Sequence, residues 1–347
     1  MPHRRARRPP QVCDQCGFER PAYNSCRNRH CPGCQAAAQR EWLEQRLVRV
    51  LPTHHFHVVF TLPSELRELA LKNGAVVYDL LLRAAAEVLG TLADDRLHVQ
   101  LGITAVLHTW TRQMLFHPHV HCVVTGGGLS RDGACWVGTP PHFLFPVAVM
   151  RKLYRGVVHA WLRDAYDKGK LAFDGDARDF ARLLRSIHRK RWVVYAKRPF
   201  AGPTQVFAYL GRYTHRVAIS DHRLLAITDD AVTFATRDGG HVTVAPDEFI
   251  RRFLLHVLPA GFHKIRHFGL YAAANVHTRL EQARARLPTP TQAGDTRVPD
   301  DDGQGAGKAE TAETRTCPCC KVGVLLRLPL PRLPQFPLAT PAPLDTS

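Results

Sequence analysis

The spacing of hydrophobic residues along the chain predicts a mixture of strands and helices. Alternating or continuous apolar runs bounded by turn residues are typical of strands, and apolar positions three or four residues apart are typical of helices. The predicted strands cover residues 55–62, 100–110, 119–125, 192–198, 224–228, 232–236 and 241–244. The predicted helices cover residues 41–50, two stretches that end near residue 93, and residues 147–166, 178–187 and 205–216.

The order of these elements indicates the fold class. The run 119–125 leads into Gly126, Gly127 and Gly128, which we interpret as a turn or hairpin. The strands at 100–110 and 119–125 are therefore expected to be sheet neighbours, and the apolar residues that follow His121 indicate a central strand. We predict an α+β fold, with a mainly antiparallel sheet and helices packed on it.

Composition divides the chain into three parts. Residues 1–48 are rich in cysteine and end in the predicted helix at 41–50, and residues 49–282 hold the main sheet. Residues 283–347 contain ten of the 25 prolines beside a polar stretch, so we expect this tail to be largely disordered.

The charge of the chain indicates a polyanionic partner. Lysine and arginine total 47 against 30 acidic residues, which gives a formal net charge of +17. Such a field attracts nucleic acid first of all. No apolar run approaches the roughly 20 residues of a membrane span, and the arginines near Met1 lead into no signal-peptide core, so we expect a cytoplasmic protein without a membrane partner.

Clustered cysteines predict a zinc site near the N-terminus. The pairs Cys13/Cys16 and Cys31/Cys34 are separated by fourteen residues, close to the spacing of paired zinc knuckles. We therefore predict a tetrahedral Zn²⁺ bound by Cys13, Cys16, Cys31 and Cys34. Cys26 and His30 leave alternatives open, since either could replace a cysteine or help to hold a second ion. The pair Cys317/Cys320 has no visible partner, and we expect it to be free or part of an intermolecular site.

A second candidate metal site lies on the predicted central strand. Because side chains alternate along a strand, His119 and His121 share one face and form half of a metal site. The third ligand must come from another element. Gln205 is narrowly preferred, with His57, His108 and Gln113 as the alternatives.

The predicted helix at 205–216 carries candidate nucleophiles. Residues four apart share a helix face, so Gln205, Tyr209 and Tyr213 form one stripe, which could also be ordinary half-buried core. Cations beside the two phenols suit contacts to a DNA backbone. A basic segment further upstream contains aromatic residues, which suit stacking on bases. The candidate DNA contacts are Arg189, Lys190, Arg191, Trp192, Arg212 and Arg216.

Together, these segments resemble a known family. CDQCG, YNSCRNRHCPGCQ, FHVVFTLP, FHPHVHCVVTGGGLSRDG and YLGRYTHR occur in the order of the rolling-circle insertion-sequence transposases, the two-tyrosine branch of the HUH endonucleases, over about residues 12–280. The resemblance implies an N-terminal zinc-binding domain and a catalytic domain. In that domain His119 and His121 hold Mg²⁺ or Mn²⁺, and Tyr209 and Tyr213 attack single-stranded DNA to leave a 5′-phosphotyrosine.

Two other hypotheses about the function compete with this prediction. A plasmid or phage rolling-circle initiator or relaxase would share the chemistry, and only the zinc unit and the matching segments argue against it. A non-catalytic, zinc-containing DNA-binding protein would keep the charge and the cysteines without strand cleavage.

Overall fold

The computed structural model describes residues 7–23, 49–200, 219, 223–236, 239–288, 317 and 319–327 of the 347. The chain forms two compact units. One combines residues from 1–28 with residues from 302–347, and the other spans residues 29–301. The predicted helices at 41–50 and 205–216 lie almost wholly or wholly outside the described residues, so they stay predictions.

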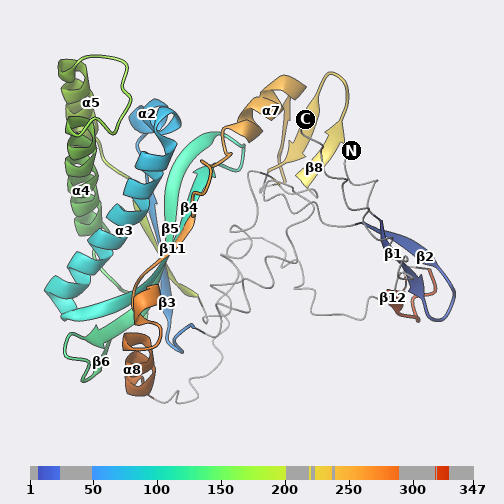
Figure 1. Ribbon diagram of the computed structural model, residues 1–347, viewed down its shortest axis with the longest axis horizontal. Helices are drawn as coiled ribbons and strands as arrows, with labels where there is room; N and C mark the ends of the chain where they lie inside the picture. The colour runs from blue at the N-terminus through green and yellow to red at the C-terminus, as the bar shows by residue number, and fades with distance from the viewer. Residues whose placement is uncertain are drawn as a thin grey trace, which may run out of the picture. The chain divides into compact units, whose positions relative to one another are not determined.

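The larger unit is built on a six-stranded antiparallel sheet (Figure 1). Its strands follow the order β11-β4-β5-β3-β7, and β6 pairs with β5. Strand β5 lies in the middle of this order, next to β4, which confirms both expectations from the sequence. The strands are β3 (His55–Thr61), β4 (Val99–Trp110), β5 (Phe116–Ser130), β6 (Trp136–Gly138), β7 (Val194–Phe200) and β11 (Ile265–Gly269).

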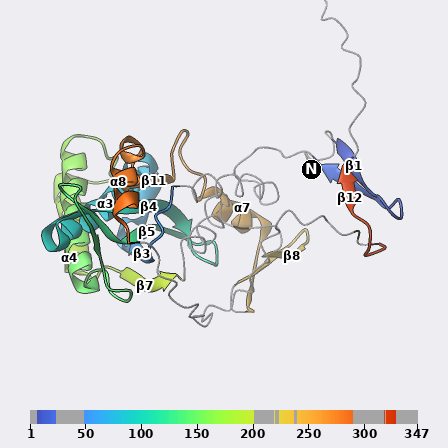
Figure 2. The same cartoon turned by 90° about the horizontal axis from the view of Figure 1, so that it is seen from below.

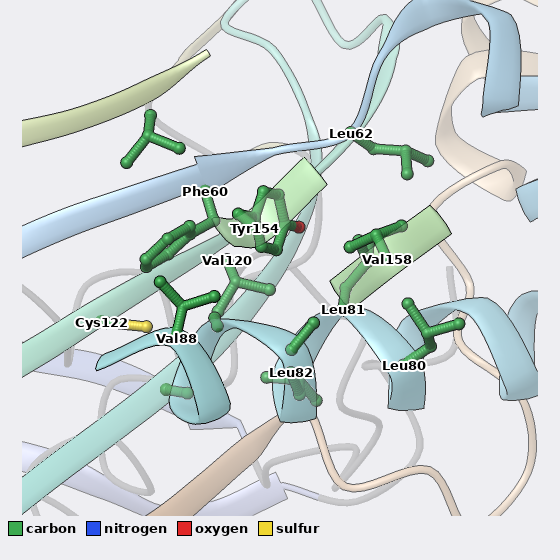
Figure 3. Close-up of a cluster of buried hydrophobic side chains, with 14 of the residues drawn as sticks. Phe60, Leu62, Leu80, Leu81, Leu82, Val88, Val120, Cys122, Tyr154 and Val158 are labelled. Carbon is green, nitrogen blue, oxygen red and sulfur yellow. The ribbon is translucent and has the colours of Figure 1, made fainter. Parts of the chain in front are cut away.

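One face of the sheet is covered by two long helices, α3 (Gly74–Leu97) and α4 (Val147–Asp167). Figure 3 shows Phe60 of β3 and Val120 and Cys122 of β5 among helix side chains such as Tyr154, whose ring centroid lies 4.8 Å from that of Phe60. Because neighbouring residues of a strand face opposite sides of the sheet, His119 and His121 lie on the other face. The apolar helix layer therefore makes a rigid support for the opposite, histidine-bearing face.

Shorter helices flank this layer. They are the 3-10 turn η2 (Ser64–Leu66), α2 (Arg67–Lys72) and α5 (Ala177–Arg189), which begins at a capping box formed by Asp176 and Asp179. The buried residues of α5, Phe180, Leu184 and Ile187, are three or four residues apart, and the helix covers the predicted range 178–187. Across the described ranges, no helix combines the length and apolar character that a membrane span needs.

The glycines after His121 are not a turn, and this prediction was wrong. Strand β5 continues through Gly126, Gly127 and Gly128 to Ser130, and only then turns back to β6. The glycines are required by close packing: a Cβ on Gly126 would lie 2.1 Å from the His54 ring. Glycine in a strand often marks such a close approach rather than a chain reversal.

A separate three-stranded sheet has the order β10-β9-β8. Its strands β8 (Leu224–Ile227), β9 (Val232–Ala235) and β10 (His241–Val244) match the predicted ones, and α7 (Pro246–Leu254) follows. Strand β11, the 3-10 turn η4 (Ala273–Asn275) and helix α8 (Arg279–Arg286) have no counterpart in the sequence analysis. Strand β11 is short, with basic residues and only half-buried side chains, so it lacks the apolar pattern that identifies a strand.

The smaller unit is a three-stranded sheet made from both ends of the chain. Strand β1 (Arg7–Cys13) lies between β2 (Glu19–Tyr23) and β12 (Leu325–Arg327). Both views show β12 beside β1 (Figures 1 and 2). The tail that the composition marks as largely disordered thus contributes an ordered strand, while most of its residues lie outside the described ranges.

Candidate metal centres

Three histidines converge on the face of the sheet opposite the helices. His119 and His121 project from β5, and His108 projects from β4, where it lies directly opposite His119 in the register. The ligating nitrogens of the three rings all lie within 4.8 Å of one another. The ring centroid of His108 is 4.2 Å from that of His121 and 5.3 Å from that of His119. We call these three residues the histidine cluster.

Hydrogen bonds orient the rings of the two β5 histidines. The Nδ1 atom of His119 lies 2.6 Å from the carbonyl oxygen of His117, so Nδ1–H donates and the lone pair is on Nε2. The Nδ1 atom of His121 lies 2.7 Å from Nε2 of His57 on β3. If His121 donates in this bond, its Nε2 atom is also deprotonated and can bind a metal ion.

Burial keeps two members of the cluster, His108 and His119, uncharged at neutral pH. Loss of solvent lowers the pKa of His119 to about 4, despite the opposing hydrogen bond to His117. Burial, followed by the nearby His119 and Lys264, lowers the pKa of His108 well below its ordinary value. The neutral imidazole is the form that ligates metal ions, so protons do not compete for these two residues near pH 7.

Only some of the candidates for a third ligand lie near His119 and His121 among the described residues. His108 joins His119 and His121, His57 is hydrogen-bonded behind His121, and Gln113 is exposed in the loop after β4. Gln205 lies outside the described residues, as do Tyr209, Tyr213, Arg212 and Arg216. The assignment of Gln205 as a metal ligand therefore stays a prediction, and so does the assignment of both tyrosines as nucleophiles.

The basic segment after α5 matches its predicted role only in part. Arg189, Lys190 and Arg191 are exposed, and Lys190 forms an ion pair with Glu65. Trp192 is buried, and its indole Nε1–H donates to the carbonyl oxygen of Ile187 at 2.9 Å. The assignment of Trp192 as a DNA contact is therefore wrong, because a ring packed in the core cannot stack on a base. The exposed aromatic ring of this segment is that of Tyr195.

Four cysteine thiols gather in the smaller unit. The sulfur of Cys13 lies 3.7 Å from that of Cys320, and the sulfur of Cys16 lies 3.6 Å from that of Cys317. Hydrogen bonds from the amides of Gly323 and Val322 lower the pKa of Cys320 to about 6, which favours the thiolate. The sequence analysis expects Cys317 and Cys320 to be free or part of an intermolecular site, but the structure places them beside Cys13 and Cys16 of the same chain. Cys26, His30, Cys31 and Cys34 lie outside the described residues.

Most of the chain matches known protein families. Residues 102–279 match the family described as "Putative transposase", and residues 8–62 match a transposase zinc-binding domain. The chain is 46% identical over 336 residues to "Putative transposase y4qJ" of Sinorhizobium fredii, which covers 92% of this chain and 84% of that protein. It is 29% identical over 260 residues to "Transposase for insertion sequence element IS801" of Pseudomonas savastanoi pv. phaseolicola, which covers 72% of this chain and 62% of that protein. No solved structure matches the chain.

The match to the family over half of the chain and the long match to the first relative define the class: this is a DNA-processing transposase. More particularly, the chain belongs to the rolling-circle insertion-sequence transposases of the two-tyrosine HUH class, and it carries their zinc-binding domain. A DNA partner and a structural zinc ion follow from this membership.

Proposed function

We propose that this transposase cuts and rejoins single-stranded DNA through a 5′-phosphotyrosine intermediate. The observation that carries the proposal is the histidine cluster, because three imidazoles on two paired strands form a preorganised metal site. A divalent ion bound there, Mg²⁺ or Mn²⁺, would supply positive charge at the phosphate oxygens of the cut site.

Each residue assigned to the site has its own role in the reaction. His108, His119 and His121 would hold the ion, and Gln205 stays a further candidate ligand. The phenolic oxygen of Tyr209 or Tyr213 attacks the phosphorus atom and loses its proton. The bond from phosphorus to the 3′ oxygen breaks, and this oxygen takes up a proton to become a free 3′-OH. The 5′-phosphate stays on the tyrosine, so the energy of the broken bond is kept for rejoining.

Two tyrosines allow two successive transfers. One holds the first 5′ end while the second attacks at the far end of the element, which suits the rolling-circle class. Exposed Arg189, Lys190 and Arg191 supply phosphate contacts along the strand, and these contacts give affinity without sequence preference. A replication initiator or relaxase would use the same chemistry, but both similar proteins are named transposases.

The test measures DNA cleavage and DNA binding separately. Purified protein is incubated with Mn²⁺ and 5′-end-labelled and 3′-end-labelled single strands of the element's termini, and covalent adducts are resolved on denaturing gels. His119→Ala/His121→Ala should form no adduct and still bind the DNA in fluorescence anisotropy, because arginine and lysine contacts dominate affinity. His142→Ala, at an exposed residue outside the cluster, is the control and should cleave normally.

The tyrosines are tested in the same assay. Tyr209→Phe/Tyr213→Phe should yield no adduct, since phenylalanine removes only the nucleophilic oxygen. Each single substitution should impair transposition while one of them still supports a single cleavage. An adduct of normal yield from the double variant, mapped by mass spectrometry to another tyrosine, would refute the assignment. Normal cutting by the double histidine variant would exclude the cluster, and tight binding by wild-type protein without any cutting would favour the non-catalytic alternative.

A further inference from the structure

The four-thiol cluster joins two C-x2-C motifs that lie about three hundred residues apart in the sequence, and both form the same kind of turn. In each motif the amide two residues after the first cysteine donates to its sulfur: Gln15 to Cys13 and Cys319 to Cys317, both at 3.4 Å. In each motif the residue after the second cysteine has a positive φ, 70° at Gly17 and 58° at Lys321.

Backbone hydrogen bonds close both turns in a similar way. The amide of Gly17 donates to the carbonyl oxygen of Cys13, and the amide of Lys321 donates to that of Cys317. The positive φ of Lys321 is uncommon for a residue with a side chain, and it is tolerated where surrounding structure requires it. Two turns of this form that face one another are the arrangement by which paired knuckles present four thiolates to one zinc ion.

The distances between sulfurs fit a metal ion rather than a disulfide. A tetrahedron with zinc–sulfur bonds of about 2.3 Å has edges of about 3.8 Å. The Cys13–Cys320 and Cys16–Cys317 sulfurs are 3.7 and 3.6 Å apart, and all four sulfurs lie within 4.8 Å of one another. A disulfide would bring two sulfurs to about 2.05 Å.

Among the residues that the structure describes, the small sheet around these thiols has little else to hold it together. Its buried apolar cluster consists of Cys13, Cys317 and Leu325, with Phe18 and Cys320 packed against them. Strand β12 has three residues and reaches β1 from the far end of the chain. A core of this size does not offset the entropy of ordering two distant segments, whereas metal binding to four thiolates stabilises such a fold strongly.

We infer that Cys13, Cys16, Cys317 and Cys320 bind one structural zinc ion, which ties the C-terminal segment to the N-terminal unit. The family match for the zinc-binding domain ends at residue 62, so the ligands Cys317 and Cys320 lie outside it. This assignment replaces the set in which Cys31 and Cys34 complete the site of Cys13 and Cys16, because a tetrahedral ion accepts only four thiolates. It does not depend on the proposed cleavage chemistry.

The test is zinc-dependent protection of individual thiols in the full-length protein. Protein with and without a strong zinc chelator is treated briefly with N-ethylmaleimide, and each cysteine is quantified by mass spectrometry. Cys317 and Cys320 should be protected only with zinc. Cys319, which is exposed between them and is not a ligand, should react in both samples and serves as the internal control.

Variants then distinguish the two ligand sets. Cys13→Ser/Cys16→Ser should expose Cys317 and Cys320 to alkylation, and Cys317→Ser/Cys320→Ser should expose Cys13 and Cys16 and lower the zinc content by one ion per chain. Cys31→Ser/Cys34→Ser should leave both protections intact. Equal reactivity of Cys317 and Cys320 with and without zinc would overturn the inference. Protection of Cys13 and Cys16 that is lost in Cys31→Ser/Cys34→Ser but kept in Cys317→Ser/Cys320→Ser would also overturn it.

Discussion

Acid should destabilise the larger unit through a buried histidine in β3. The ring of His55 is fully buried, with Nδ1 2.8 Å from the carbonyl oxygen of Thr53 and Nε2 2.9 Å from the hydroxyl of Tyr271. Nδ1–H must donate to the carbonyl, so Nε2 accepts from the tyrosine O–H. The tyrosine oxygen in turn accepts from the amide of Leu51 at 3.3 Å. Protonation of Nε2 would leave the hydroxyl hydrogen facing another donor.

The size of the effect follows from the pKa of His55. Burial lowers this pKa from 6.5 to about 4, although the bond to Thr53 opposes the change. As pH falls below about 6.5 the unfolded chain takes up a proton at His55, and the folded chain does so only near pH 4. The unfolded state therefore binds more protons in this window, and the free energy of unfolding decreases as the pH is lowered. Each tenfold change in proton affinity is worth about 1.4 kcal/mol, so His55 alone accounts for a loss of about 3 kcal/mol by pH 4.

Urea unfolding between pH 7.5 and 4.5 measures this loss. His55→Gln keeps a polar side chain without a titrating ring, so its free energy of unfolding should fall less steeply with pH than that of the wild type. His277→Gln replaces an exposed histidine and should keep the wild-type slope. Other buried histidines contribute equally to all three proteins and cancel in the comparison. Parallel slopes for His55→Gln and the wild type would refute the reasoning, whatever their absolute stabilities.

Two further predictions concern the histidine cluster and strand β5. His57→Phe keeps a ring against His121 and removes the hydrogen bond between them, so Mn²⁺ affinity measured by calorimetry should fall about 10- to 100-fold; unchanged affinity would show that His57 does not orient His121. Gly127→Ala should cost about 1–3 kcal/mol in urea unfolding, because its φ is 130° and its Cβ would lie 2.4 Å from the carbonyl oxygen of Val137. Gly156→Ala, at an open helical position, should instead stabilise the unit by about 0.4–1 kcal/mol, and a similar loss in both variants would contradict the packing argument.

The pattern of the sequence predicts four of the six strands of the larger sheet, β3, β4, β5 and β7, and two of the three histidines of the cluster. Alternation alone places His119 and His121 on one face, and the apolar residues around them indicate a central strand. The third histidine depends on the register between β4 and β5, which brings His108 opposite His119. Register includes irregularities near the hairpin that no periodicity encodes, so the sequence could name His108 as a candidate but could not rank it above Gln205.

Local sequence patterns gave wrong predictions for residues whose role depends on contacts with distant parts of the chain. Glycines that normally punctuate a chain stand inside β5, because β6 and the segment before β3 pack against them. Trp192 lies among arginines in the sequence, yet it packs on Tyr154 of α4 with ring centroids 5.4 Å apart. Cys317 and Cys320 show only half of a metal site, since their partners lie at the other end of the chain. In each case the missing information is tertiary, and a short sequence window cannot contain it.

The chemistry of the two proposed centres follows from their donor atoms. Four thiolates fill the coordination sphere of zinc and leave no position for a substrate, so the cysteine centre can hold chain segments together but cannot act on a phosphate. Three imidazoles leave positions for phosphate oxygens and water, which a cleavage site needs. The thiolate centre can form only when the two ends of the chain meet, whereas the imidazoles stand on neighbouring strands fixed by a helix-covered core. Rigid placement matters most for the centre that reacts, and the central strands of the sheet provide it.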